Sequence, residues 1–388
     1  MTADGHGSDA LSGMGRAATG LVLEGRSTED GALLRVAVEG GVITGLERPP
    51  TGASRDWISP GWLDLQVNGF EGHDPNAVGA EASATIGMVR ALWAHGVAGV
   101  CPTICTQSEN HMLAALRAVA EACEQDPLVA ASVVGIHVEG PHIATEDGPR
   151  GAHPLEHVRR PDVAEYRRWQ DAAGGRIRLV TLAPERTGAI PFIERLVAKG
   201  IVVALGHTPA GGNAIRAAVD AGARISTHLG NGCAAMLPRH DNPIWHQLAN
   251  DELLASVIAD GHHLPHDVLK SIIRGKTPNR MILTCDASPL AGLPPGRYAE
   301  WGSEFDVLAN GKIAVPGTPY LAGSGVFTDH CVSHILNATD ATVAQAVEMA
   351  SVRPRQLLSL PVPVVTAGAA MDELVLFRWS RGKPISIL

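Results

Sequence analysis

The sequence predicts an α/β fold: a (β/α)8 TIM-like barrel with a small β-sandwich domain built from both ends of the chain. Three observations favour it. Short apolar runs alternate with helix-like stretches from Ser59 to Pro289, polar residues sit at the ends of these runs, and segments of alternating apolar and polar residues flank them. With 388 residues, of which 45% are hydrophobic, the chain can fill a core of barrel size.

The two flanking segments predict the domain organisation. Residues 20–49 alternate apolar and polar side chains around a turn signal at Glu39-Gly40-Gly41, and residues 372–388 alternate in the same way, a pattern typical of antiparallel strands. We therefore expect residues 17–57 and 360–388 to form the small β domain and residues 58–359 to form the barrel. Residues 1–16 are small and polar, and we expect a disordered lead-in there.

Eight apolar runs are the candidate barrel strands. Helical patterns near 83–95, 109–124, 189–199, 211–222 and 265–273 lie between several of them, as right-handed crossovers between parallel strands require. An open doubly wound sheet is disfavoured because no GxGxxG follows the first run. In chain order the runs are PGWLDLQVNG, GVAGVCPTIC, VVGIHVEGP, RIRLVTLAPE, IVVALGHTPA, ARISTHLGN, LASVIADGHH and MILTCDASP.

Polar side chains at the ends of these runs predict one functional site. In a parallel barrel the carboxyl ends of all strands meet on one face, where the chemistry is placed. The residues concerned are Asp64, Gln66, Asn68, Thr103, Glu139, Glu185, His207, His228, Asp260, His262, His263 and Asp286.

Glu139, His207 and His228 are the candidate metal ligands. Two imidazoles and one carboxylate from three strand ends form a known ligand set for a catalytic divalent metal, with one position left for water. Taken singly, each histidine is more often a hydrogen-bonded structural residue, and Glu139 could pair with Arg150. Asp286, at the end of the last run, suits a general base, although it could equally cap the following turn.

Charge and composition exclude other classes of function. The net charge is −9 and the sequence pI about 6.0, with no block of like charges, so we expect no nucleic-acid partner and no anionic membrane surface. No apolar run reaches membrane-spanning length and no signal peptide is recognisable, which predicts a soluble cytoplasmic protein. The six cysteines form no CxxC and are read as free thiols.

The motifs together resemble N-acetylglucosamine-6-phosphate deacetylases of the amidohydrolase superfamily, over residues 20 to about 385. They are PGWLDLQVNG, HVEGPHI with GAHP, LAPE, GHTPA, THLGNG, IADGHH, CDASPLAG and LAGS, in this order. The resemblance implies hydrolysis of an N-acetyl amino sugar, N-acetylglucosamine 6-phosphate above all, to the amino sugar and acetate. It assigns metal binding to Glu139, His207 and His228, acid/base catalysis to Asp286 and a helping role to His153.

The resemblance also implies a cofactor. One divalent ion is expected, zinc first, with iron, cobalt and manganese as alternatives. Two-metal amidohydrolases place a histidine pair on the first strand, where this chain has Gln66 and Asn68. The absence of those imidazoles favours a single metal ion.

Substrate binding is also implied by the resemblance. The family recognises the 6-phosphate with residues that correspond to Asn231, Gly232, Arg239 and His263, and the arginine comes from a neighbouring subunit, which implies a homodimer. The chain departs from the family in two places: His262 precedes His263, and the segment NGCAAMLPRHDNPIWHQL adds the residues His240, Asp241, Asn242 and Trp245. An unphosphorylated or other N-acyl amino sugar is therefore an alternative substrate.

Two further alternatives stay open. A dihydroorotase or hydantoinase would need the first-strand histidines and a bridging lysine, and Glu139 stands where that lysine is required. A barrel that binds a sugar without catalysis is disfavoured because all four chemical residues are present. Bound metal and acetate release would distinguish an enzyme from such a binding module.

Overall fold

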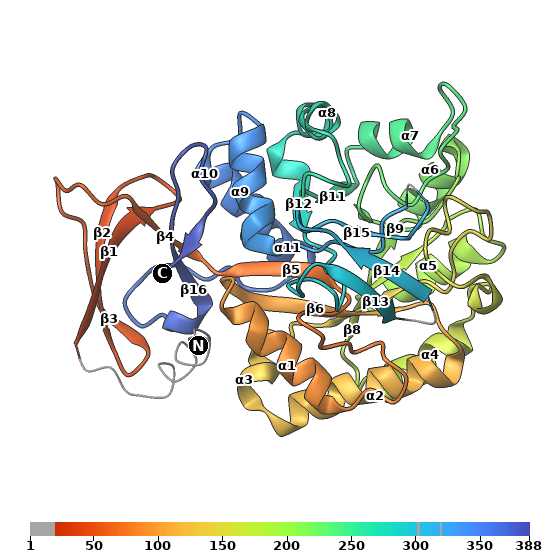
Figure 1. The fold of residues 1–388 in the computed structure, drawn as a ribbon, viewed down its shortest axis with the longest axis horizontal. Coiled ribbons are helices and arrows are strands. Elements are labelled where there is room, and N and C mark those ends of the chain that lie inside the picture. Colours follow the sequence, from red (N-terminus) through yellow and green to blue (C-terminus); the bar gives the residue numbers. More distant parts are fainter. Residues whose placement is uncertain (1–19, 301–302, 319) are drawn as a thin grey trace, which may run out of the picture.

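The computed structural model describes residues 20–300, 303–318 and 320–388, and the lead-in predicted for residues 1–16 lies outside them. The described strands form sheets of eight, six and three strands. Figure 1 shows the eight-stranded sheet surrounded by helices, with the six-stranded sheet beside it at the end of the molecule where the chain begins.

The eight-stranded sheet is the predicted parallel barrel. Neighbouring strands pair in parallel from first to last. A parallel bridge between Val67 and Ala287, and an N–H of Asp286 donating to the Gln66 carbonyl at 3.1 Å, bring the two edges together. The strands are β5 (Trp62–Val67), β6 (Val97–Cys105), β7 (Ile136–Glu139), β8 (Ile177–Leu182), β9 (Val202–Leu205), β10 (Ile225–Ser226), β11 (Leu254–Ile258) and β12 (Met281–Thr284).

The barrel interior is apolar at one end and polar at the other. Leu63, Leu179 and Ile282 belong to a buried cluster inside the ring, and Leu358, from the C-terminal helical segment, packs against them. This segment therefore plugs the end at which the strands begin. The polar residues predicted from the sequence gather at the opposite end, where the strands stop.

Helices cover the outside of the barrel (Figure 1). Each predicted helix exists within a few residues of its expected bounds, and side chains cap several starts: Ser108, Asp162 and Asn242 accept backbone N–H bonds at the first turns of α2, α4 and α7. The α-helices are α1 (Ala82–Trp93), α2 (Glu109–Gln125), α3 (Pro127–Ser132), α4 (Val163–Ala172), α5 (Ala189–Val197), α6 (Gly212–Asp220), α7 (Pro243–Ala249), α8 (His266–Lys276), α9 (Thr328–Ala338), α10 (Val343–Val347) and α11 (Arg353–Leu357). Shorter helical turns are η2 (Leu155–His157), η3 (Pro278–Arg280), η4 (Glu348–Val352) and η5 (Met371–Glu373).

The two ends of the chain meet in the six-stranded sheet, as predicted. Its order is β17-β16-β4-β1-β2-β3, and β16 runs antiparallel to β4 with Leu374 opposite Pro60. Gly40 and Gly41 form the predicted turn with φ angles of 58° and 78°. The sheet curls back on itself, because Val42 of β3 forms an antiparallel bridge with Ala370, just before β16. Its strands are β1 (Leu21–Ser27), β2 (Leu33–Glu39), β3 (Val42–Glu47), β4 (Asp56–Pro60), β16 (Leu374–Arg378) and β17 (Ser386–Ile387).

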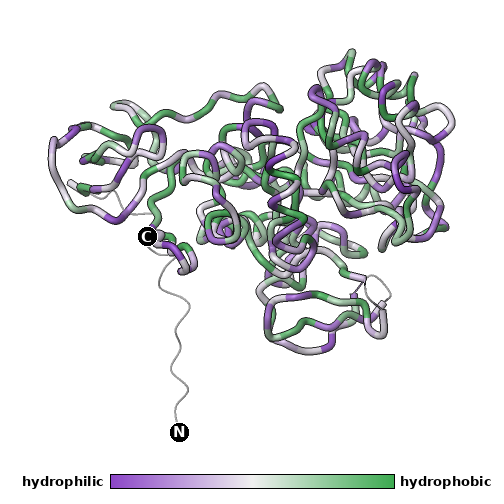
Figure 2. The backbone as a smooth tube through the Cα atoms, turned by 90° about the horizontal axis from the view of Figure 1, so that it is seen from above, coloured by the Kyte–Doolittle hydropathy of each residue, from purple (hydrophilic) through white to green (hydrophobic). Residues whose placement is uncertain are grey.

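A three-stranded antiparallel sheet follows the last barrel strand and was not predicted. It comprises β13 (Gly296–Glu300), β14 (Ser303–Val307) and β15 (Ile313–Ala314). Phe305, Val307 and Ile313 form its own small core with Leu290. Seen from above in Figure 2, it projects from the barrel as a separate lobe.

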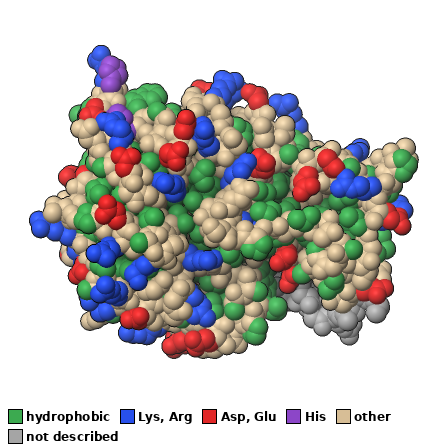
Figure 3. Space-filling model, turned by 180° about the vertical axis from the view of Figure 1, so that it is seen from behind, with side chains coloured by type: hydrophobic (Ala, Val, Ile, Leu, Met, Phe, Trp, Pro, Cys, Tyr) green, Lys and Arg blue, Asp and Glu red, His purple; other side chains and the backbone are tan. Residues whose placement is uncertain are grey.

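The surface carries no dominant charge on the face seen in Figure 3, where acidic and basic side chains are interspersed. Among the helices that the structure describes, none combines the length and the apolar character needed to cross a membrane. All six cysteines are free, and Cys101, Cys123, Cys285 and Cys331 are buried.

Candidate metal centre

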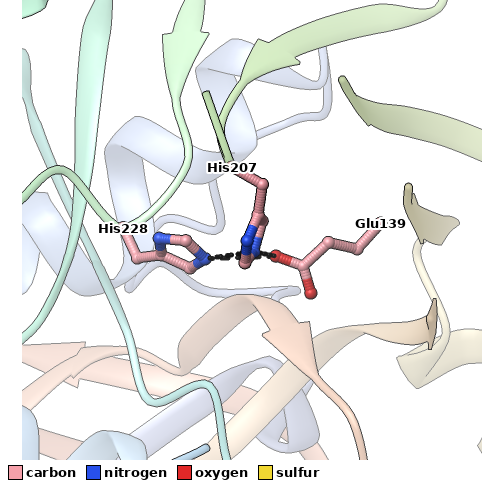
Figure 4. A group of neighbouring side chains, drawn as sticks. All are labelled: Glu139, His207 and His228. Carbon is pink, nitrogen blue, oxygen red and sulfur yellow. Dashed lines mark hydrogen bonds and ion pairs between the residues drawn. The ribbon is translucent and has the colours of Figure 1, made fainter. Parts of the chain in front are cut away.

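Three strand ends bring Glu139, His207 and His228 together. Glu139 is the last residue of β7, and the two histidines follow β9 and β10 by two residues each. All three are buried, with exposed fractions of 3%, 8% and 3%. Figure 4 shows the two imidazole rings and the carboxylate turned toward one point. Residues far apart in the sequence are therefore neighbours at the predicted face of the barrel.

The distances in this cluster match the ligand sphere of a transition metal. Oε1 of Glu139 lies 3.2 Å from Nε2 of His207 and 3.2 Å from Nε2 of His228, and the two nitrogens are 3.1 Å apart. Ligands about 2.1 Å from a tetrahedral zinc ion stand about 3.4 Å from each other. Within the described residues, this is the only group of three or more metal-ligating residue types whose ligand atoms all lie within 4.8 Å of one another.

The hydrogen bonds orient the histidines as ligands. Nδ1 of His207 lies 2.9 Å from the carbonyl of Pro149, an acceptor only, so Nδ1 carries a proton and Nε2, which faces the cluster, is the nitrogen that can coordinate an ion. His228 is held by its backbone N–H, which donates to Oγ of Ser256 at 2.8 Å. Its Nδ1 is buried and has no hydrogen-bond partner among the described residues.

Electrostatics favours a charged Glu139. Burial raises the pKa of this carboxyl, but hydrogen bonds and charge interactions with His207 and His228 outweigh burial and hold the pKa well below its usual range. Burial lowers the pKa of His228, but the Glu139 carboxylate outweighs burial, so that its pKa is raised. The site therefore places an anionic carboxylate among imidazoles, and it attracts a cation.

Backbone strain marks the same positions. His207, His228 and Asp286 have φ angles of 50°, 31° and 52°, values that residues other than glycine seldom adopt and that concentrate at functional sites. Gly232 packs against both imidazoles: a Cβ there would lie 3.1 Å from Nδ1 of His207 and from Cε1 of His228. The chain is thus folded tightly around the two histidines.

Asp286 lies across the cluster and is tied to Glu139 through Gln66. The Gln66 side-chain amide donates to Oε1 of Glu139 at 2.9 Å and to Oδ1 of Asp286 at 3.0 Å, and Asn68 donates to the same Asp286 oxygen at 2.7 Å. Burial, followed by the charge of Glu139, raises the pKa of Asp286 to about 7. A carboxylate with such a pKa suits proton transfer at neutral pH.

His153 reaches the cluster from the loop after β7. Its Nε2 lies 3.3 Å from Nε2 of His207, and its Nδ1 lies 2.8 Å from Oγ1 of Thr106. Burial, followed by the charge of His207, lowers the pKa of His153 to about 3, so the ring is neutral near pH 7. The structure therefore brings His153 and Asp286 to the same place as the three candidate ligands.

The expected phosphate-binding residues lie partly at this site. Gly232 touches the ligand histidines, and the Asn231 side-chain nitrogen nearby is buried without a hydrogen-bond partner in the described chain. His263 donates from Nδ1 to Asp260 at 2.7 Å, and its charge is close enough to lower the pKa of Asp286. His262 instead contacts the carbonyl of Asn310, before β15, at 3.0 Å.

Arg239 is not brought to the site by this chain alone. It is exposed, in a loop without regular structure that precedes α7, and its guanidinium has no hydrogen-bond or ion-pair partner within the described residues. The residues added next to it have structural roles: Asp241 accepts the N–H of Gly212 and pairs with His246, and Asn242 caps α7. Trp245 is 54% exposed.

Some neighbours of the cluster were not singled out from the sequence. Cys105, at the end of β6, lies with its sulfur 3.4 Å from Oδ1 of Asn68 and 3.9 Å from Oε2 of Glu139. Thr106 supports His153. Both follow Thr103, the polar residue that the sequence did mark on β6, and their position at the strand end was the signal that could have found them.

Comparison with known proteins gives relatives along most of the chain. N-acetylglucosamine-6-phosphate deacetylase of Bos taurus is 37% identical over 320 residues, which cover 78% of this chain and 75% of the relative. N-acetylgalactosamine-6-phosphate deacetylase of Escherichia coli O157:H7 is 32% identical over 340 residues, covering 86% and 88%.

A solved structure is similar over almost the whole fold. A mutant of the N-acetyl-D-glucosamine-6-phosphate deacetylase of Mycobacterium smegmatis, in complex with N-acetyl-D-glucosamine-6-phosphate, superposes with a TM-score of 0.80 at 28% identity. The superposition covers 92% of this chain and 93% of the other. No family model matches the chain.

Proposed function

The chain belongs to the N-acetylglucosamine-6-phosphate deacetylase family of the amidohydrolase superfamily, and we propose that it hydrolyses N-acetylglucosamine 6-phosphate to the amino sugar phosphate and acetate. One observation carries this proposal. The buried side chains of Glu139, His207, His228 and Asp286 lie close together at the end of the barrel where the strands stop. The match to this chain covers more than two thirds of the length of each relative with this name.

The three ligands fit one divalent transition metal, and we propose zinc. Two imidazole nitrogens with one carboxylate oxygen suit a borderline ion such as zinc, and the Pro149 carbonyl, which accepts from Nδ1 of His207, leaves Nε2 of that ring to coordinate. When bound, the metal would supply Lewis-acid polarisation of the acetamide carbonyl and acidification of a water molecule. Gln66 and Asn68 offer amides where a second metal would need imidazoles, which favours a single ion.

Asp286 is the proposed acid/base. Its Oδ1 accepts hydrogen bonds from Gln66 and Asn68, which hold the carboxylate beside the ligands and leave Oδ2 free for a water proton. Asp286 takes this proton as water attacks the acetamide carbon, and it then gives the proton to the amine nitrogen as the C–N bond breaks. Water is consumed, and acetate and the amine leave.

His153 is the proposed donor to the oxygen that becomes negative in the transition state. The Thr106 hydroxyl lies 2.8 Å from Nδ1 of His153 and 3.4 Å from the Glu139 carbonyl. We propose that the hydroxyl donates to Nδ1, which leaves the ring proton on Nε2, the nitrogen turned into the site. Because burial and His207 keep the ring neutral, this single N–H is the one that stabilises the oxyanion.

The 6-phosphate is the proposed partner of Asn231, the Gly232 backbone, His263 and His262, completed by Arg239 of a second copy of the chain. The buried and unpaired amide of Asn231 supports this, because a buried donor without an acceptor is costly unless a ligand meets it. The exposed and unpaired Arg239 is placed to reach outward, and guanidinium can bind phosphate through two parallel bonds. A homodimer and a cytoplasmic location remain predictions, and light scattering tests the first.

Acetate release from a panel of sugars tests the proposed reaction. We expect the zinc-loaded protein to release acetate from N-acetylglucosamine 6-phosphate with a kcat/KM well above that for unphosphorylated N-acetylglucosamine. Equal rates for the two sugars would favour the unphosphorylated alternative. No acetate from any sugar, in protein shown to hold metal, would favour the binding module.

A second candidate substrate is N-acetylgalactosamine 6-phosphate. It is supported by the N-acetylgalactosamine-6-phosphate deacetylase of Escherichia coli O157:H7, which is 32% identical to this chain. The match covers 88% of the length of that relative. The panel therefore includes both epimers at position 4, and the ratio of their kcat/KM values assigns the sugar.

A further inference from the structure

A second group of histidines lies outside the catalytic cluster, between α8 and α9. His330 and His334 are on α9, four residues apart, and this spacing puts both side chains on one face of a helix. Two histidines at this spacing are a familiar chelating pair for zinc. His266, the first residue of α8, stands against them: the centroids of its ring and that of His334 are 5.0 Å apart.

The spacing of these rings is close to that in the catalytic cluster. His207 and His228, which converge on one point, have ring centroids 4.8 Å apart, against 5.0 Å for His266 and His334. The rings of His330 and His334 are 6.4 Å apart and nearly parallel, with an interplanar angle of 8°. His330 is exposed, and its ring bonds to the backbone of Asp260, so its side chain has to rotate away from that bond to bring a nitrogen toward the other two.

His334 carries an unpaired nitrogen. Its Nε2 is buried and has no hydrogen-bond partner among the described residues, which is costly for a polar atom unless something binds it. Gly261 packs against the Cε1 edge of the ring, where a Cβ would lie 2.9 Å from Cε1 and 3.6 Å from Nε2 of His334. His334 is thus fixed in position with one nitrogen uncommitted.

The three imidazoles are suited to binding a cation and not to forming ion pairs. The nearby carboxylates have other partners: Asp329 pairs with His95 at 3.1 Å and Asp260 with His263 at 2.7 Å. Among the described residues, no carboxylate is therefore paired with the three imidazoles, which leaves them available to a cation.

We propose that His266, His330 and His334 form a second transition-metal site, separate from Glu139, His207 and His228. Three imidazoles suit zinc, nickel or copper in the divalent state, with water in the remaining position. The ligand atoms are not assembled as they are in the catalytic cluster, so the ion closes the site by drawing His330 inward. An ion there joins α8 to α9 and holds the loop of Asp260 to His263 between them.

Metal content tests the proposal. The protein is saturated with Zn²⁺, desalted and analysed for zinc per chain, for the wild type and for a double variant, His330→Gln with His334→Gln. We expect the double variant to hold one zinc ion fewer than the wild type and to keep its deacetylase activity. His157→Gln, a histidine outside both clusters, is the matched control and should bind as the wild type does. Equal zinc in wild type and double variant overturns the proposal.

A second experiment separates the two sites and guards against misfolding. In a His228→Asn background, which removes a catalytic ligand, Zn²⁺ should still raise the melting temperature, because an ion that binds only the folded state stabilises it. Adding His266→Gln, at an exposed position, should reduce this rise. If zinc gives the same rise with and without His266, the site is not where we place it. Neither result depends on the deacetylase reaction, so each proposal can fail alone.

Discussion

The metal centre and the loop of residues 229–242 are adjacent in the structure but differ in how they are held. Glu139, His207 and His228 are almost fully buried, and His207 and His228 are fixed by further bonds, to Pro149 and Ser256. The loop before α7 exposes Met236 to 89% and leaves Arg239 without a partner. The chemical centre is thus complete within one chain, whereas the expected phosphate site needs something from outside it.

The difference follows from what each region is attached to. The ligands sit at the ends of barrel strands, whose backbone bonds fix their positions, and rigid elements hold a catalytic geometry more accurately than loops do. The loop has no strand neighbours and can vary in sequence without disturbing the barrel. Of the two departures from the family pattern, the one that adds Trp245 lies in this loop and at its edge. Four substitutions probe this contrast, in decreasing order of expected effect.

His228→Asn should abolish both bound metal at the centre and acetate release, because two ligands are too few to hold the ion against buffer chelators. Zinc analysis and a turnover assay measure the two effects on the same sample. His157→Asn, the same change in a histidine of η2 that is not part of the cluster, should alter neither. Retention of full activity by His228→Asn would remove the metal centre from the mechanism.

Asp286→Asn should lower turnover by about 10²- to 10⁴-fold, the usual scale for losing an acid/base group, while bound metal stays constant. Asparagine keeps an oxygen for the hydrogen bonds from Gln66 and Asn68, so the geometry should survive. Steady-state kinetics beside zinc content checks this. Near-normal turnover would contradict the assigned role.

Gln66→Met should reduce kcat by about 10- to 100-fold, the range found when groups that support a metal ligand are changed. Methionine has a similar volume but cannot donate to Glu139 and Asp286, so the two carboxylates lose their shared neighbour. Gln66→Glu should reduce kcat further than Gln66→Met does, because it adds a third carboxylate beside Glu139 and Asp286. Kinetics for the pair of variants tests whether the amide donors matter or only the volume.

Arg239→Ala should raise KM about tenfold for the phosphorylated sugar, the low end for a bond to a charged group, since the side chain is exposed. KM for the unphosphorylated sugar and kcat should change little. Arg195→Ala, at an exposed position on α5, is the control. If both sugars are affected equally, Arg239 does not read the phosphate.

The sequence was sufficient to predict those parts of the molecule in which a local pattern of residues shows where a segment lies in the whole fold. The eight apolar runs became β5 to β12, and a polar residue at the end of a buried strand could only face the mouth of a barrel. Glu139, His207 and His228 could be brought together on that argument alone. The turn at Gly40 and Gly41 was likewise predictable, because the left-handed backbone it needs favours glycine.

Other features depend on contacts that no local pattern reports. Gln66 was noted for the histidine it replaces, whereas its bridge between Glu139 and Asp286 joins residues more than 70 positions apart. Thr106 supports His153 across a loop. The sheet of β13 to β15 lies in a segment rich in glycine and proline, where strands are short and their apolar faces small. The spacing from Asn231 matched Arg239 to the phosphate-binding arginine of the family. Spacing does not show that the guanidinium of Arg239 has no partner among the described residues of its own chain.

One pairing in the small sheet has a consequence for biosynthesis. β4 needs β16 as its neighbour, and the ion pair that joins them, Arg378 with Asp56, links positions 322 residues apart. While the ribosome is still making the barrel, β4 therefore presents an unpaired edge, the kind of surface on which nascent chains associate wrongly. β4 leads directly into the first barrel strand, so β16, which is translated after the barrel, covers the strand from which the barrel starts.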